Sequence, residues 1–412
     1  MKSGWKTKTL EDACQFSNGL WKGEKPPFAN VGVIRNTNFT KEGTLDDSDI
    51  AYLDVEAKKL EKRRLQFGDI ILEKSGGGPK QPVGRVALFD KEDGVFSFSN
   101  FTAALRVIDP YELDFRFLHK FLHWTYLAGI TEGMQSHSIG IRNLDGDAYK
   151  AIKISFPPLS EQQRIVGILD EAFEDIATAK ANTEKNLQNA RAIFDGYLQS
   201  VFTQHGKGWV DTTLGAEIDL LAGFAFKSTQ YTSSNNDIRL LRGDNIVQGC
   251  LRWDDVKRWP SNDAKAYERY QLHEGDVVLA MDRPWVNAGL KHATISADDL
   301  PCLLVQRTAR LRGGADIANR FLMYLIGSEA FIRHILGVQT GIGVPHISGQ
   351  QIKDFKFARP PIAEQQHIAN KLESLRRETQ RLATIYERKI LELDALKKSL
   401  LYQSFTGNLR IR

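Results

Sequence analysis

The chain has 412 residues, of which 42% are hydrophobic and 26% charged, and this balance excludes a disordered or collagen-like chain. At roughly 100 to 200 residues per domain, the length allows two or three folded units. The formal net charge of +4 is too small for this length to indicate nucleic-acid binding by itself, so any basic surface has to be local.

The cysteines and the first residues indicate the compartment. Cys14, Cys250 and Cys302 lie far apart without a CxxC pair, which argues against a disulfide framework or a zinc knuckle and favours a reducing environment. The N-terminus carries charges and Trp5 where an export signal needs an apolar run, and no stretch approaches the ~20 apolar residues of a membrane helix. We therefore expect a cytoplasmic protein.

The first predicted domain covers residues 1–158. Short apolar runs at 70–72, 86–89 and 101–107 predict strands, and Gly, Asn and Asp separate them. A helical pattern covers 115–127. Together these elements predict a compact mixed α/β (α+β) domain.

A long helix is predicted over residues 159–205. It opens after Pro157-Pro158 with Ser160 as a capping signal and then contains no proline. Its apolar positions alternate in steps of three and four, which is a heptad seam with one adjustment: Ile165, Leu169, Ala172, Ile176, Ala179, Thr183, Leu187, Ala190, Phe194, Tyr197 and Val201. A helix of about 40 residues is roughly 60 Å long, far more than one small domain needs.

The whole plan then repeats once. The segment from Pro157 to Ile165 recurs from Pro360 to Ile368, and Gly68–Leu72 recurs as Gly275–Leu279. Further matches join Trp5 to Trp209, Arg116–Leu118 to Arg320–Leu322, Gly133–Gln135 to Gly337–Gln339 and Phe202-Thr203 to Phe405-Thr406. We therefore predict a second domain at 206–361 and a second long helix at 362–408.

The second helix keeps the register of the first. Its seam positions are Ile368, Leu372, Leu375, Thr379, Leu382, Tyr386, Ile390, Leu393, Lys397, Leu400 and Ser404. We expect the two helices to pair as an antiparallel coiled coil, which relates the two domains by a pseudo-two-fold repeat. The alternative is that each helix packs only on its own domain.

No pattern of catalytic residues emerges. Gly76-Gly77-Gly78-Pro79-Lys80 lacks the spacing and the hydroxyl of a P-loop, and neither GxGxxG after a strand nor HExxH is present. Asp69, Glu73 and Lys74 suggest a nuclease metal site, but the second copy keeps only the Asp, so a Gly-Asp turn is the preferred interpretation. His119 and His123 have metal-ligand spacing, yet their counterparts are Met323 and Gly327, and we expect half-exposed helix residues.

Tandem α/β domains, each followed by a PP-[LI]-x-EQQ-x-I helix, resemble the specificity (S) subunit of type I restriction-modification systems over nearly the whole chain. The resemblance implies two target recognition domains joined by conserved helices. Trp5 to Leu10 and Trp209 to Leu214 are similar to the family's domain openings. Val344 to Ser348 is similar to a familiar tail of such domains, whereas the first copy has Ile141 to Asp145, which leaves a universal role for His346 unsupported.

The function that the resemblance implies is non-catalytic DNA recognition. Such a subunit selects an asymmetric bipartite target in double-stranded DNA and directs adenine methylation and restriction by its partners, two modification subunits and the restriction subunits. Cofactors are expected on the partners only, namely S-adenosylmethionine, ATP and Mg²⁺, and none on this chain.

Base-reading residues are expected on loops, because Arg or Lys suits guanine and Asn or Gln suits adenine in the major groove. In the first domain the candidates are Arg35, Asn36, Asn38, Lys74, Ser75, Lys80, Gln81, Arg85, Gln135, Ser136, His137, Arg142 and Asn143. In the second they are Arg242, Asp244, Asn245, Asp282, Arg283, Trp285, Asn287, Gln339, Thr340 and His346. Each is otherwise an ordinary solvated loop residue, and Trp285 is otherwise a core side chain.

Docking of the modification subunits is expected where helix and domain meet. The candidates are Gln162, Gln163, Ile165, Gln365, Gln366 and Ile368, whose alternative role is helix capping and core packing. Two other functions remain open. A coiled-coil adaptor without direct DNA reading requires no base-contacting loops, and a fused methyltransferase or nuclease requires a cofactor or metal motif that the sequence lacks.

Overall fold

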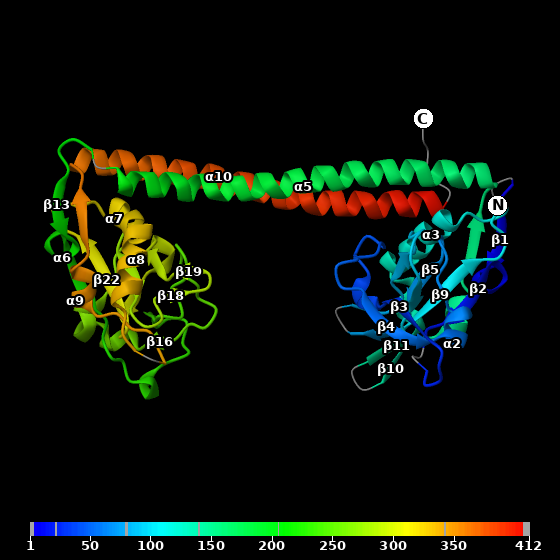
Figure 1. Ribbon diagram of the computed structural model, residues 1–412. Helices are drawn as coiled ribbons and strands as arrows, with labels where there is room; N and C mark the ends of the chain where they lie inside the picture. The colour runs from blue at the N-terminus through cyan, green and yellow to red at the C-terminus, as the bar shows by residue number, and fades with distance from the viewer. Residues whose placement is uncertain are drawn as a thin grey trace. The chain divides into compact units, whose positions relative to one another are not determined.

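The computed structural model describes residues 4–20, 23–78, 81–138, 141–204, 206–341 and 343–406, with the side chains of 137 and 138 left aside. The chain divides into two units (Figure 1). Unit 1 comprises residues 1–184 and 388–412, and unit 2 comprises residues 185–387. Each unit therefore combines one globular domain with segments of both long helices.

The helices and strands of the first domain alternate along the chain, as expected for a mixed α/β domain. In order they are β1 (Lys6–Thr9), α1 (Leu10–Ala13), β2 (Cys14–Asn18), β3 (Phe28–Ile34), η1 (Asn36–Asn38), β4 (Ala51–Glu56), α2 (Ala57–Glu61), β5 (Ile70–Glu73), β6 (Ser75–Gly77), β7 (Val86–Leu88), β8 (Phe96–Phe98), β9 (Thr102–Val107), α3 (Phe115–Leu127), η2 (Ile130–Met134), β10 (Gln135–Ser138), β11 (Ile141–Leu144), α4 (Gly146–Lys150) and β12 (Lys153–Phe156). The long helix α5 (Leu159–Thr203) follows.

The second domain has a similar order, but two helices replace α3, a 3-10 helix replaces α2, and its described residues form no strands equivalent to β10 and β11. Its elements are β13 (Val210–Thr213), α6 (Leu214–Glu217), β14 (Ile218–Ala222), η3 (Ser228–Gln230), β15 (Ile238–Leu241), β16 (Arg258–Trp259), η4 (Ser261–Tyr270), β17 (Val277–Ala280), β18 (Trp285–Val286), β19 (Gly289–Leu290), β20 (His292–Thr294), η5 (Ala297–Asp299), β21 (Cys302–Leu304), β22 (Thr308–Gly313), α7 (Asn319–Ile326), α8 (Glu329–Val338), α9 (Gly349–Lys353) and β23 (Lys356–Arg359). The second long helix is α10 (Ile362–Phe405).

Three sheets have the same strand topology in the two domains, whereas the β10-β11-β6 sheet of unit 1 and the β18-β19 ribbon of unit 2 differ. A four-stranded sheet has the order β2-β9-β5-β7 in unit 1 and β14-β22-β17-β20 in unit 2. A three-stranded sheet has the order β4-β3-β8 in one and β16-β15-β21 in the other, with one antiparallel and one parallel pairing in each. The ribbon β1-β12 corresponds to β13-β23 and joins each domain's opening to the strand before its long helix. The internal repeat inferred from sequence is confirmed at the level of strand pairing.

The two long helices run antiparallel, as predicted. In unit 1, Lys180 of α5 pairs with Asp394 of α10 at 2.7 Å. In unit 2, Arg191 pairs with Glu387 at 2.8 Å, and the Lys371 ammonium lies 4.7 Å from the ring centre of Tyr197. Residues later in α5 therefore contact residues earlier in α10, which is the pattern of an antiparallel pair. The alternative, in which each helix packs only on its own domain, is wrong.

The predicted seam holds with one correction. Every predicted α5 position is buried or half-buried, but Leu382 of α10 is 38% exposed and its neighbour Ala383 is buried. The helix takes two successive steps of four, Leu375 to Thr379 to Ala383, before the alternation resumes. The adjustment compensates for the drift of a 3.6-residue helix against a 3.5-residue repeat.

Aromatic side chains attach both helices to the domains. In unit 1, Phe405 near the end of α10 packs on Phe117 of α3 with ring centres 5.3 Å apart. In unit 2, Phe202 near the end of α5 packs on Phe321 of α7 at 5.5 Å. The repeated Phe-Thr therefore contacts equivalent helices, because the antiparallel pairing brings the end of each long helix to the domain that precedes the other. Burying such rings contributes much of the domain-to-helix stability.

No single described helix is long and apolar enough to cross a membrane. The bent pair α7 and α8, which meet at 59°, passes that test together by length and composition. Phe321 and Leu322 of α7 and Phe331 and Ile335 of α8 are fully buried in the core of unit 2, against the sheet and the long helices. Figure 1 shows both helices next to the α5 and α10 segments of this unit.

His119 and His123 are buried, each only 4% exposed, so the expectation of half-exposed residues is wrong. They lie on the face of α3 that meets the loop at Gly43, whose carbonyl lies 2.8 Å from His119 Nε2. Burial, and then the positive charge of Lys120, lowers the pKa of His119 to about 4. Burial, together with His119 and the nearby lysines, lowers the pKa of His123 to about 3.

These pKa shifts predict acid destabilisation of unit 1. Because the unfolded histidines bind protons near pH 6.5 and the folded ones do not, stability is full above pH 6.5 and falls as the pH drops toward 4 and 3. At pH 5 we expect a loss of about 2 kcal/mol per histidine relative to pH 7. Urea unfolding at both pH values measures it. His123→Leu should remove about half of the pH dependence, and an unchanged pH dependence would contradict this account.

Candidate nucleic-acid interface

An Arg-x-x-Asn turn occurs at the same place in both domains. Asn38 accepts a hydrogen bond from the Arg35 backbone at 2.9 Å and donates to the carbonyls of Asp46 and Asp49. Asn245 accepts from the Arg242 backbone at 3.1 Å and donates to the Arg252 carbonyl. Both asparagines are 2% exposed. The two amides are therefore committed to holding the loop.

The arginine side chains of these turns also form hydrogen bonds within their own loops. Arg35 donates to the Asp49 carboxylate and carbonyl, and Arg242 does the same with Asp255. Both arginines were predicted to read bases. In this structure each of them stabilises its own loop through the same pair of contacts. Asn36 and the exposed Asp244, which lie inside the turns, remain the residues placed to meet a ligand.

In unit 1 the loop candidates converge on a cleft of about 370 Å³, lined by Asn36, Thr37, Glu73, Gly76, Gly77, Gly78, Gln81 and Arg85. Glu73 is buried at its floor and binds the Arg85 guanidinium through both oxygens, at 2.7 and 2.9 Å. The Asn36 amide donates to the same carboxylate at 3.0 Å. The Gln81 amide lies within 2.9 Å of Arg85.

A three-stranded sheet, β10-β11-β6, forms one wall next to this cleft and joins candidates from three distant segments. Ser75 donates to the Asn143 side chain at 2.5 Å, and Gln135 donates to the Val83 carbonyl at 3.1 Å. Arg142 and Ser136 lie on the same hairpin. Figure 1 shows β10 and β11 at the end of the unit opposite the long helices.

The remaining candidates of unit 1 are less well placed or undescribed. Lys74 donates to the Asn18 side chain at 2.9 Å, and burial lowers its pKa. Lys80 and the side chain of His137 lie outside the described residues.

Unit 2 reproduces the Ser75–Asn143 contact with different chemistry. Asp282 and His346 occupy the matching positions, form an isolated bridge and join through Nδ1 of the histidine. Asp282 also binds Arg307, and the combined interactions lower the pKa of its carboxyl group. The Thr340 backbone pairs with that of His346, at 2.7 and 2.9 Å. His346 therefore takes the place of Asn143.

Most of the other candidates of unit 2 face solvent. Arg283 and Asn287 are exposed, and Trp285 is 39% exposed rather than a core side chain. Arg283 has φ of +45°, where a side chain is strained, and its N–H donates to the Pro345 carbonyl at 2.7 Å. Gln339 is half-buried at the end of α8.

The Gly-Asp segments are turns, as the repeat suggested. Asp69 caps the turn through the Gln66 N–H and binds Arg106 at 2.7 Å. Asp276 does the same with the His273 N–H and Arg312. Among the described residues no group of three or more His, Cys, Asp or Glu side chains is placed to hold a metal ion.

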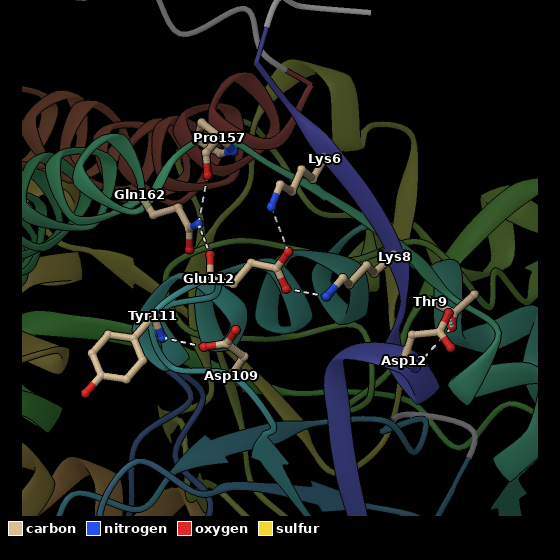
Figure 2. A network of polar contacts seen from close by, with 9 residues as sticks. All are labelled: Lys6, Lys8, Thr9, Asp12, Asp109, Tyr111, Glu112, Pro157 and Gln162. Carbon is tan, nitrogen blue, oxygen red and sulfur yellow. Dashed lines mark hydrogen bonds and ion pairs between the residues drawn. The ribbon is translucent and has the colours of Figure 1, made fainter.

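In each EQQ motif, the first glutamine forms hydrogen bonds that join the long helix to the globular domain. Gln162 accepts from the Asp114 N–H at 2.9 Å and donates to the carbonyls of Glu112 and Pro157, both at 2.8 Å. Figure 2 shows this contact beside Lys6 and Lys8, which bind the Glu112 carboxylate. Because Asp114 is the N-cap of α3, Gln162 fixes the start of that helix against α5.

Unit 2 contains the same clamp. Gln365 accepts from the Ala318 N–H at 2.9 Å and donates to the carbonyls of Asp316 and Pro360, both at 2.8 Å. Gln162 and Gln365 have no exposed surface, and Ile165 and Ile368 are buried in the two cores. Four of the six docking candidates are therefore buried in the protein interior. Of the six, only Gln163 and Gln366 are exposed.

Sequence reasoning missed three residues that the structure places at these sites. Glu73 was considered only as a metal ligand, whereas it neutralises Arg85. Arg307, with φ of +64°, binds Asp282, and Lys291 occupies the position in unit 2 that Arg85 has in unit 1. Aligning the strands after the Gly-Asp repeat would have paired Arg85 with Lys291, because each directly precedes the strand that pairs with the Gly-Asp strand.

Two solved structures share the fold of this chain. A chain from a structure of complex assembly and conformational transition of the type I R-M system aligns with a TM-score of 0.77 and 17% identity, covering 99% of both chains. The HsdS subunit from Thermoanaerobacter tengcongensis aligns with a TM-score of 0.65 and 18% identity, covering 99% of this chain and 98% of that one. The fold is that of a type I specificity subunit.

The sequence places the chain in a family. It belongs to the type I restriction modification DNA specificity domain family, whose model matches twice, at residues 2–188 and 208–388. The EcoAI specificity subunit of Escherichia coli is 41% identical over 170 residues, which is 41% of this chain and 28% of that subunit. The resemblance inferred from the EQQ repeats is confirmed.

Proposed function

We propose that this chain is the DNA-specificity subunit of a type I restriction-modification complex and recognises a bipartite target in double-stranded DNA. The observation that carries the proposal is the duplicated domain, with polar loops brought together in each copy, joined through one antiparallel helix pair. Two weak readers in one molecule bind one duplex more tightly than either alone, because the second contact is intramolecular.

The target is asymmetric, because the two domains present different groups at matching positions. Asn143 and Ser75 in unit 1 correspond to His346 and Asp282 in unit 2. Amide and carboxylate groups select different base edges in the major groove. The length of the helix pair then sets the number of unread base pairs between the two recognised segments.

The partners in this proposal are two modification subunits, one for each copy of the repeat, and through the complex the restriction subunits. Gln163 and Gln366 are the exposed residues of the EQQ motifs and serve as docking contacts. This chain itself acts without catalysis, in the cytoplasm. S-adenosylmethionine, ATP and Mg²⁺ belong to the partners, which carry out adenine methylation and restriction.

The test is methylation mapping with and without this chain. The chain is co-expressed with the modification subunit encoded beside it, and methylated adenines are located by long-read sequencing. We expect a split asymmetric motif that disappears when the chain is omitted. Methylation that is unchanged without the chain, or absent from a purified and assembled complex, would contradict the proposal and favour the coiled-coil adaptor.

A further inference from the structure

The strand pairing of the two units defines equivalent positions on their recognition surfaces. Glu73 of β5 pairs with Thr102, and Ala280 of β17 pairs with Thr308 in the same register. The Glu73 N–H donates to the Arg85 carbonyl at 2.8 Å, and the Ala280 N–H donates to the Lys291 carbonyl at 3.0 Å. Lys291 is thus the counterpart of Arg85, and Ala280 that of Glu73.

The Arg-x-x-Asn turns add a third equivalence. Because Arg35 and Asn38 make the same contacts as Arg242 and Asn245, Asn36 corresponds to Gly243. A Cβ atom built on Gly243 would lie 3.9 Å from the Lys291 Nζ and 4.0 Å from the Ala280 Cβ. The lysine ammonium therefore lies over the glycine, in the region that the Asn36 side chain occupies in unit 1.

The charge at this place differs between the units. In unit 1 the cation is neutralised, because Glu73 binds Arg85 through both oxygens and also accepts from Asn36. In unit 2, Ala280 and Gly243 supply neither a carboxylate nor an amide. Within the part of the chain that the structure describes, the Lys291 ammonium has no hydrogen-bond or ion-pair partner.

The surroundings of Lys291 leave it available to an external acceptor. It is half-buried, and burial lowers its pKa, with Asp244 acting in the opposite direction. The Asp282 carboxylate is already engaged by His346 and Arg307. Exposed Arg283 also contributes positive charge, in a strained conformation at the position of Gly76 in the other unit. A partly desolvated cation without a partner is costly unless a ligand supplies an acceptor.

We propose that the Lys291 ammonium donates a hydrogen bond to the bound DNA, to either the acceptor edge of a guanine or a phosphate oxygen. This inference rests on the proposed function and adds a specificity-determining residue to unit 2. It also implies that the two domains bind differently. Unit 2 gains affinity from a free cation, whereas unit 1 presents a neutral, preassembled hydrogen-bonding cluster.

The experiment compares Lys291→Met, Lys291→Arg and Lys265→Met in the complete complex with the modification subunits. Lys265 is exposed on η4 and serves as the control for loss of one positive charge in the same unit. Affinity for the mapped target, for targets with single substitutions in either half, and for unrelated duplex is measured across a salt series. Circular dichroism and thermal unfolding verify that each variant is folded.

A guanine contact predicts that Lys291→Met reduces discrimination at one base pair of one half-site about 5- to 100-fold, with relaxed methylation there. A phosphate contact predicts weaker binding to all duplexes and a slope of log affinity against log salt that is smaller by about 1. Lys291→Arg should retain most of the affinity, and Lys265→Met should leave every value unchanged.

The inference is overturned if folded Lys291→Met matches the wild type in affinity, salt slope and methylation motif while the wild-type complex reads its target. It is also overturned if Lys265→Met produces an equal loss. If the wild-type complex shows no dependence on this chain, the proposed function itself fails, which is a different result from either of these.

Discussion

Replacing Gln162 with alanine is expected to destabilise unit 1 by about 3 kcal/mol. The substitution removes the side-chain partner of one backbone N–H, of Asp114, and of two carbonyls, of Glu112 and Pro157, all of them partly or fully buried. Each buried polar group that loses its partner costs about 1 to 3 kcal/mol. Because the clamp joins the N-cap of α3 to α5, the loss should appear as faster hydrogen exchange in residues 115–127.

The neighbouring glutamine is the matched control. Gln163 is exposed on the same helical turn, so Gln163→Ala should change stability by no more than about 0.5 kcal/mol. Gln365→Ala and Gln366→Ala repeat the comparison in unit 2, where protection of α7 should fall only in the first variant. Equal effects of Gln162→Ala and Gln163→Ala would show that the clamp is not what stabilises the junction.

Replacing Glu73 with alanine is expected to destroy the reading of one half of the target. Arg85 then loses the carboxylate that binds it through two hydrogen bonds, and its side chain is only 16% exposed. Breaking such a buried pair from one side costs about 3 to 5 kcal/mol, because an uncompensated charge remains. Methylation mapping should show one half-site relaxed or lost, while the half read by unit 2 is retained.

A double substitution distinguishes the effect of the unpaired Arg85 charge from the effect of losing the polar side chains of the cleft. Glu73→Ala with Arg85→Ala removes both charges, so unfolding in urea should show a smaller loss of stability than Glu73→Ala alone. Recognition of that half-site should stay impaired in both variants, because both lack the Glu73 carboxylate that lines the cleft. A wild-type motif in Glu73→Ala would exclude the cleft from target recognition.

The architecture was predictable because its signals are repeated and periodic. The apolar steps from Ile165 to Val201 and their copy predicted the paired helices, since only a long partner can bury so long a seam. The recurrence of Gly-Asp before β5 and β17 predicted a turn in each domain, and the structure confirms both turns, with Arg106 and Arg312 as partners of the aspartates. The misplaced position, Leu382, lies where the repeat itself changes step.

The candidate sites were only partly predictable, because loop residues of one type serve two purposes. Asn38 and Asn36 are two positions apart in the same turn, yet one is buried as a brace and the other lines the cleft. Similarly, Gln162 and Gln163 are identical in type, and only the geometry of the junction decides which one is buried. Periodicity does not distinguish such neighbours, since their partners come from segments far away in the chain.

The amino-acid sequence by itself determined the duplication, the two domains and the antiparallel helix pair, because repeats and heptads are encoded in local spacing. Only the tertiary structure decided which polar side chains are bound by other parts of the chain and which are not, because that depends on contacts between strands distant in sequence. Glu73 neutralises Arg85 across a β-sheet, and the absence of a matching carboxylate leaves Lys291 unpaired within the described part of unit 2.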